Sequence, residues 1–168
     1  MNPMREIKIE KVTLNVGCGG DADQIERAKK LLVMLTDSKP VVTKSKRRST
    51  FGIARHKPVG VMVTLRGKKA VEFLKLGFAG VENRMSTKQF DKEGNFSFGI
   101  KEYIELPGID YKHEIGMLGL DVVVNLERAG FRIKRRRVQK RKVPIKHKIN
   151  KEEAIEWVKK NFEVEVVG

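Results

Sequence analysis

The sequence predicts an α+β domain: a mainly antiparallel sheet with helices packed on one face, a long basic loop and a basic C-terminal extension. Several segments alternate apolar and polar residues, which indicates strands with one buried face and one polar face. Between them, apolar residues recur at helical spacing. Antiparallel sheets commonly keep one face polar while helices cover the other. We therefore expect one core within these 168 residues.

The first predicted strand covers residues 11–16, and glycines from Gly17 onward end it. Asp21 is the predicted N-cap of the helix that follows, with Gln24 three residues later as a variant of the capping box. Pro40 cannot continue this helix. Its apolar residues recur at helical spacing: Ile25, Ala28, Leu32 and Leu35.

The middle of the chain predicts a short strand over residues 41–43 and a long basic loop over residues 44–58. Strict alternation then predicts a strand over residues 59–66. The spacing of apolar residues predicts a helix over residues 68–79, which Gly80 ends.

The last third of the chain contains two more predicted strands and one helix. Residues 83–95 are typical of a loop. A strand begins at Phe96, and its alternation slips before Tyr103, which predicts a bulge. A strand over residues 120–126 follows, and after the basic stretch Asn150 and Glu153 cap a final helix. We expect residues 1–130 to form the domain and residues 131–168 to form a basic arm and a helix that pack on it or extend it.

Two long stretches of the chain contain bases and no acids. The chain has 36 Lys and Arg against 21 Asp and Glu, a net charge of +15. Ten bases lie between Asp37 and Glu72, and twelve lie between Glu127 and Glu152. The other 14 bases and all 21 acids give the rest of the chain a net charge of −7. A charge run is often only a solvated surface, but segregation on this scale favours a polyanionic partner.

The sequence gives no indication of a membrane or secretory protein. No apolar run approaches the roughly 20 residues that span a bilayer, and residues 1–10 lack the apolar stretch of a signal peptide. Cys18 is the single cysteine, so no internal disulfide can form. We expect a cytoplasmic protein that is a monomer when free.

A glycine-rich turn raises the alternative of a dinucleotide-binding enzyme. Residues 17–22 match the G-x-G-x-x-A fingerprint between a strand and a helix. However, Asp21 and Asp23 place negative charge where a pyrophosphate needs the helix N-terminus. Lys44 stands where an acid would hold the ribose. We interpret this segment as a tight turn.

Other motifs give no catalytic residue, cofactor or metal. Residues 91–102 have acids at the first and twelfth positions of a calcium loop, but Phe96 replaces the required glycine. The three histidines, His56, His113 and His147, lack the spacing of metal ligands. We therefore expect no enzyme activity.

The basic stretches remain as the candidate binding elements. In the long loop, Phe51 and Ile53 lie among the bases, and an aromatic there can stack on an exposed base. Residues 132–148 carry ten bases in 17 residues, which favours an extended arm that RNA orders. Such charges bind RNA and DNA alike, so a general nucleic-acid-binding regulator remains an alternative.

Six blocks of the sequence together are specific: KVTLNVG at 11–17, KPVVTK at 39–44, VTLRG at 63–67, FDKEGNFSFG at 90–99, PGIDY at 107–111 and GLDV at 119–122. They resemble the universal large-subunit ribosomal protein five family, which binds 5S rRNA. The basic arm and the HKINKEEA segment at 147–154 resemble the archaeal and eukaryotic branch.

The resemblance implies a ribosomal protein that anchors 5S rRNA in the central protuberance of the large subunit. Its further partners would be large-subunit rRNA, P-site tRNA, neighbouring large-subunit proteins and, through residues 110–113, a head protein of the small subunit. The residues that would contact 5S rRNA are Asn15, Ser38, Thr43, Lys44, Lys46, Thr64 and Arg66. Bacterial relatives tend to have Gln at the position of Ser38. The residues that would contact tRNA are Phe51, Gly52, Arg55, His56 and Lys57. The residues that would make additional rRNA contacts are Arg47, Arg48, Arg135, Arg136, Arg137, Lys140, Arg141 and Lys142.

Overall fold

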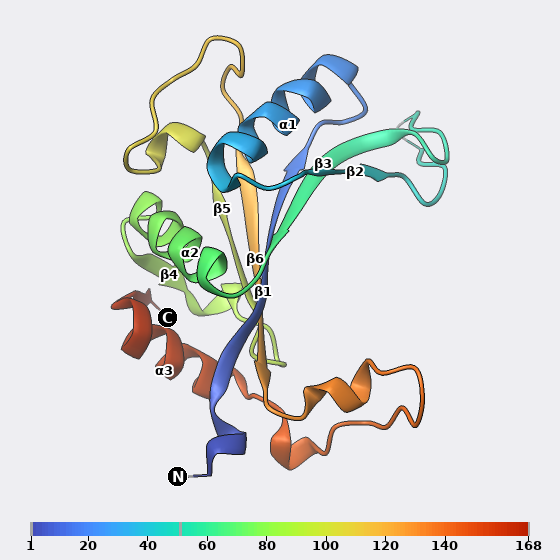
Figure 1. Ribbon diagram of the computed structural model, residues 1–168. Helices are drawn as coiled ribbons and strands as arrows, with labels where there is room; N and C mark the ends of the chain where they lie inside the picture. The colour runs from blue at the N-terminus through green and yellow to red at the C-terminus, as the bar shows by residue number, and fades with distance from the viewer. Residues whose placement is uncertain (1, 51, 168) are drawn as a thin grey trace.

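The computed structural model describes residues 2–50 and 52–167. Its main sheet has five strands in the order β2-β3-β1-β6-β5, and every neighbouring pair is antiparallel. Figure 1 shows this sheet with its helices. The strands are β1 (Ile7–Gly17), β2 (Val41–Lys44), β3 (Pro58–Leu65), β5 (Phe96–Ile100) and β6 (Leu120–Arg128). The α-helices are α1 (Ala22–Thr36), α2 (Lys68–Gly80) and α3 (Lys151–Phe162). The predicted α+β class is confirmed.

One face of the sheet forms the core. Along β1, Val12, Leu14 and Val16 are buried, and they alternate with partly exposed polar residues. They belong to one hydrophobic cluster with Leu32 of α1 and Leu74 of α2. Each fully buried side chain of this kind stabilises the fold by about 1.5–3 kcal/mol relative to exposure. The helices cover the apolar face of the sheet, so the polar residues that alternate along β1 lie on the opposite face.

The C-terminal residues pack into the same core. A second sheet of two parallel strands joins β4 (Arg84–Ser86) to β7 (Glu165–Val167). The prediction that residues 83–95 form only a loop is wrong for β4. A strand of three residues is too short to show alternation, and its partner lies far away in the sequence. Ala154 and Val158 of α3 are fully buried in the main cluster.

The local predictions are confirmed in part. Asp21 is the N-cap of α1, but its carboxylate accepts from the N–H of Asp23 rather than forming a capping box. The predicted bulge before Tyr103 is wrong, because β5 ends at Ile100 and a 3₁₀ turn, Tyr103–Glu105, follows. Register shifts occur instead in β1, between Ile9 and Lys11, and at the end of β2. The capping box of α3 is confirmed, with Glu153 accepting from the N–H of Asn150 at 3.0 Å.

Candidate nucleic-acid interface

The face of the sheet opposite α1 and α2, here called the open face, is polar and carries little charge. The strand register and the alternation of burial place small or uncharged side chains on it, with Lys11 and Asp121 as charged members of its central part. Its residues on the four longer strands include Lys11, Thr13, Asn15, Gly60, Met62, Thr64, Ser97, Gly99, Asp121, Val123 and Asn125. Such a surface offers hydrogen-bonding groups at a fixed spacing, which suits the shallow minor groove of an RNA helix.

Asn15 and Thr64 lie close together on this face. Thr64 pairs with Thr13, and Asn15 pairs with Met62, which lies two residues before Thr64 in β3. Diagonal neighbours of this kind are about 7–8 Å apart. Both side chains are half-buried, and within residues 2–50 and 52–167 neither makes a side-chain hydrogen bond. Their amide and hydroxyl groups are therefore available to a ligand.

Asp121 lies directly across the strand pair from Asn15, and the sequence-based prediction did not include it. Both residues line a hollow of about 290 Å³, together with Gly17, Gly99 and Lys101. An ionised carboxylate only accepts hydrogen bonds, so Asp121 suits a donor such as a ribose 2′-hydroxyl and repels a phosphate. The alternation of β6, with Val122 facing inward, was the signal that could have placed Asp121 on the open face.

Thr43 joins the open face from β2, where it pairs with Gly60. Lys44 and Arg66 are exposed at the ends of β2 and β3. Ser38 lies elsewhere, in the connection after α1, where its hydroxyl donates to the carbonyl of Thr36 at 3.0 Å. The structure thus brings Asn15, Thr43 and Thr64 together but does not bring Ser38 to the same face.

The loop between β2 and β3 projects from one end of the sheet. Its base is closed by two backbone hydrogen bonds, from Ser45 to the carbonyl of Lys57 and from His56 to the carbonyl of Ser45. Gly52 is exposed at a positive φ of 77°, whereas Phe51 lies outside the described residues. In the part of the loop that the structure describes, the exposed bases make no ion pair; they are Lys46, Arg47, Arg48, Arg55 and Lys57.

The arm after β6 is attached to the sheet through Arg135. Its guanidinium forms ion pairs with both Glu10 and Glu127, so this predicted rRNA contact is already neutralised. Arg136 donates to the carbonyl of Gln139 at 2.9 Å. The other predicted bases of the arm are exposed and make no ion pair within the described residues; they are Arg137, Lys140, Arg141 and Lys142.

Arg128 belongs to the second basic stretch of the sequence, yet its position makes it a structural residue. It is only 5% exposed and donates to the carboxylate of Glu153 at 2.9 Å and to the carbonyl of Lys148 at 3.0 Å. The backbone N–H of Asn150, with Arg128, holds the pKa of Glu153 below its ordinary 4.5. A charge count alone cannot separate such a buried base from exposed ones.

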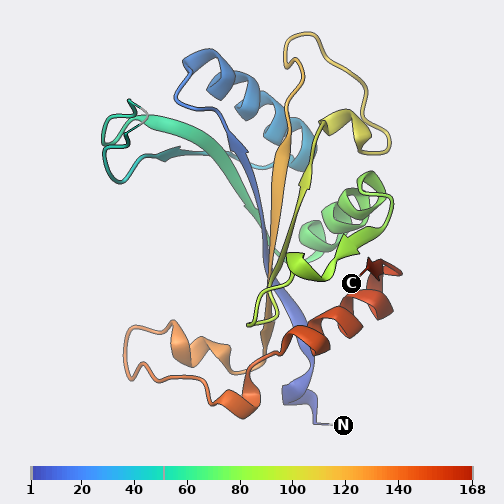
Figure 2. The same ribbon diagram turned by 180° about the vertical axis from the view of Figure 1, so that it is seen from behind.

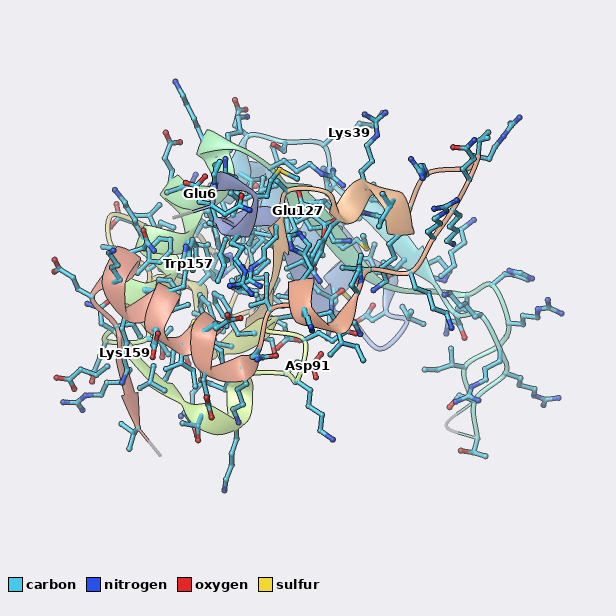
Figure 3. The ribbon with its side chains drawn as sticks, turned by 90° about the horizontal axis from the view of Figure 1, so that it is seen from below. Glu6, Lys39, Asp91, Glu127, Trp157 and Lys159 are labelled. Carbon is cyan, nitrogen blue, oxygen red and sulfur yellow. The ribbon has the colours of Figure 1, made fainter. Side chains whose placement is uncertain are left out.

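The basic loop and the arm lie on the same side of the molecule and flank the open face from its two ends. Figures 1 and 2 show both segments projecting away from α2 and α3. Figure 3, from below, shows α3 with Trp157 and Lys159 on one side and the arm and loop on the other, with Glu127 near the base of the arm. Positive charge that is not paired within the described residues therefore borders a polar, weakly charged sheet surface.

The glycine-rich turn has the local features of a helix cap. Cys18 is buried, and desolvation raises the pKa of its thiol. The carboxylate of Asp21 already accepts a hydrogen bond from the N–H of Asp23 in the first turn of α1. Among the described residues, no group of three or more acidic, His or Cys side chains is placed to hold a metal ion. In the same part of the chain, no helix has the length and apolarity that crossing a bilayer requires.

Comparison with known proteins decides the family. Residues 2–53 match the family described as Ribosomal protein L5, and residues 58–157 match the model of the C-terminus of the same ribosomal family. The chain belongs to the ribosomal protein L5 family. Similar proteins named large ribosomal subunit protein uL5 come from Sulfurisphaera tokodaii (47% identical, 99% of this chain and 96% of the relative), Methanosphaera stadtmanae (44%, 99% of each) and Methanobrevibacter smithii (42%, 99% of each).

Membership of this family confirms the resemblance found in the sequence, including its archaeal type. The chain is a ribosomal protein of the large subunit, which is a cytoplasmic particle. Its role is structural rather than enzymatic.

Proposed function

We propose that this protein anchors 5S rRNA in the central protuberance of the large subunit, with the open face as the binding surface. The observation that supports this most strongly is the juxtaposition of Asn15, Thr64 and Asp121 between two basic segments. Backbone phosphates of 5S rRNA would meet Lys44 and Lys46 at the start of the loop and the bases of the arm, while the sheet would set the register of the RNA. Most of the affinity then comes from phosphate neutralisation, and it decreases as salt rises.

Substitutions on the open face test this assignment. Each of Asn15→Ala and Thr64→Ala should weaken 5S rRNA binding by about 1 kcal/mol, the usual scale of one lost hydrogen bond. Thr87→Ala is the matched control, because Thr87 is also half-buried but lies in the 3₁₀ turn after β4. Filter retention at constant salt measures the three affinities. If both open-face variants bind like the control, the open face is not the 5S site.

We further propose that the basic loop contacts P-site tRNA through Phe51, Gly52, Arg55, His56 and Lys57. The hydrogen bonds that close the base of the loop support this, because they hold the loop away from the sheet, and its bases make no ion pair within the described residues. The double variant Arg55→Ala, Lys57→Ala should keep 5S binding within about two-fold, while reconstituted ribosomes hold P-site tRNA less tightly. Loss of 5S binding in this variant would instead assign Arg55 and Lys57 to the 5S site.

We propose a further partner from the exposed surface and from the family. Residues 110–113 are exposed and include Tyr111, a large side chain 51% accessible, which fits a contact with a small-subunit head protein.

We also propose that residues 131–168 form one folding unit with residues 1–130, because Ile149, Ala154 and Val158 share the main core.

A further inference from the structure

A pocket of about 720 Å³ lies between the arm and the sheet, and we call it the arm pocket. Its wall includes Leu126 at the end of β6, and the arm contributes Phe131, Val143 and Ile145. The pocket volume lies within the range of about 300–1,000 Å³ that is usual for small-ligand sites. Lys11 and Asn125, at the edge of the open face, also line it, whereas Asn15, Thr64 and Asp121 do not.

The charge around the arm pocket is strongly positive. Seven of its lining residues are basic and two are acidic. Both acids are already paired, Glu10 with Arg135 and Glu93 with Lys148 and Lys134. These two lysines also hold the pKa of Glu93 below its ordinary value, Lys148 through its hydrogen bond. Other bases of the lining, such as Lys140, Arg141 and Lys142, make no ion pair within the described residues. They can therefore bind an anionic ligand.

The pocket also presents apolar surface to solvent. Ile145 is 86% exposed, although it lies within one of the most cationic segments of the chain. Phe131 is half-buried, with one ring edge against His147 at a centroid distance of 5.7 Å. An isoleucine that is exposed among lysines and arginines is unfavourable in water. Its side chain can instead cover the face of a nucleobase.

Contacts at both ends of the arm hold the pocket in shape. Arg135 joins the start of the arm to the sheet, and Arg128 and Lys148 hold its end. The turn at Gly94 packs so closely on Ile149 that an added Cβ would lie 2.6 Å from the Cγ2 atom. A ligand therefore meets a site that is already formed, which lowers the entropy cost of binding.

We propose that the arm pocket receives an unpaired nucleotide of ribosomal RNA. Its base would lie against Phe131 and Ile145, and its phosphates would lie along Lys140 to Lys142. This inference rests on the rRNA-binding role proposed above, but it concerns a pocket that adjoins the open face and does not include Asn15, Thr64 or Asp121. The combination of an apolar wall with a cationic rim favours a nucleotide over an acidic peptide, because Asp and Glu side chains have no flat ring for the wall to cover. Either 5S rRNA or large-subunit rRNA can supply such a nucleotide.

The test compares Ile145→Ala with Val138→Ala in the full-length chain. Val138 is the matched control, because it is 68% exposed on the same arm but does not line the pocket. Both variants should unfold at the wild-type urea concentration, since neither side chain is buried. Affinities are measured for 5S rRNA, for large-subunit rRNA and for a fully paired RNA duplex.

We expect Ile145→Ala to weaken binding to one of the two rRNAs by about three- to ten-fold, with Val138→Ala unchanged. The loss should persist at high salt, whereas the loss caused by Lys140→Ala should shrink. Binding to the duplex should not change. Equal behaviour of Ile145→Ala and Val138→Ala on both rRNAs, or an equal loss on the duplex, overturns the proposal. Neither result depends on Asn15 and Thr64, whose variants test the 5S surface separately.

Discussion

Removing the carboxylate of Glu153 should loosen the attachment of the arm and destabilise the whole fold. Glu153 is the acidic partner of Arg128, and it also accepts from the N–H of Asn150 at the start of α3. The variant Glu153→Ala leaves a guanidinium that is only 5% exposed with carbonyl acceptors alone. A buried charge that loses its partner is strongly destabilising.

The magnitude follows from the two lost interactions. A hydrogen bond to a charged group contributes about 1.5–3 kcal/mol, and one capping interaction contributes about 0.5–1 kcal/mol. Because the Glu153 side chain is 41% exposed, solvent screens part of the first term. We therefore expect a loss of about 2–3 kcal/mol in the free energy of unfolding, which lowers the Tm by about 4–12 °C for a chain of this size.

Urea unfolding followed by circular dichroism measures this loss. Glu152→Ala is the matched control, because Glu152 is the neighbouring acid in the first turn of α3 but has no ion pair within the described residues. It should lose only the interaction with the helix dipole, about 0.3–1 kcal/mol. Equal losses in the two variants would refute the view that Glu153 holds Arg128 and the arm.

Two further predictions concern acid stability and strand packing. The pKa of Glu153 is lowered by folding, so its contribution is present above pH 4.5 and is lost as the pH falls through the folded value; thermal melts between about pH 5 and pH 3 should therefore show a smaller decrease in Tm for Glu153→Gln than for the wild type. An added Cβ at Gly60 would lie 2.7 Å from the carbonyl oxygen of Val16, whereas at Gly99 the nearest atom is 3.5 Å away on the Asp121 side chain. Gly60→Ala should lose about 1–3 kcal/mol in urea unfolding and Gly99→Ala much less, and equal losses would contradict the close approach of β1 and β3.

Most of the main sheet could be predicted because its central strands β1, β3 and β6 are long and have one polar face. Val12, Leu14 and Val16 alternate over enough residues for the period to identify a strand and its buried side. The same alternation placed Asn15 on the polar face. The helix start at Asn150 was also local information, since both members of the capping box lie within four residues.

Other features depend on contacts between distant parts of the chain. β4 exists because β7 pairs with it, and three residues carry no periodic signal. Arg128 lies within a basic stretch of the sequence, but its burial follows from the position of Glu153 and the arm. The arm pocket likewise requires Phe131 and Ile145 to meet the end of β6, which charge patterning cannot reveal.

Selective binding of 5S rRNA tests the central claim most directly. The wild-type protein is titrated against 5S rRNA by filter retention across a salt series, with an unrelated structured RNA of equal length as competitor. We predict that 5S rRNA retains its preference near physiological salt, because the open face adds contacts that do not depend on phosphate neutralisation. Equal binding of both RNAs, with both lost together as salt rises, would mean that the basic loop and the arm act alone, and would contradict a 5S-binding role for the open face.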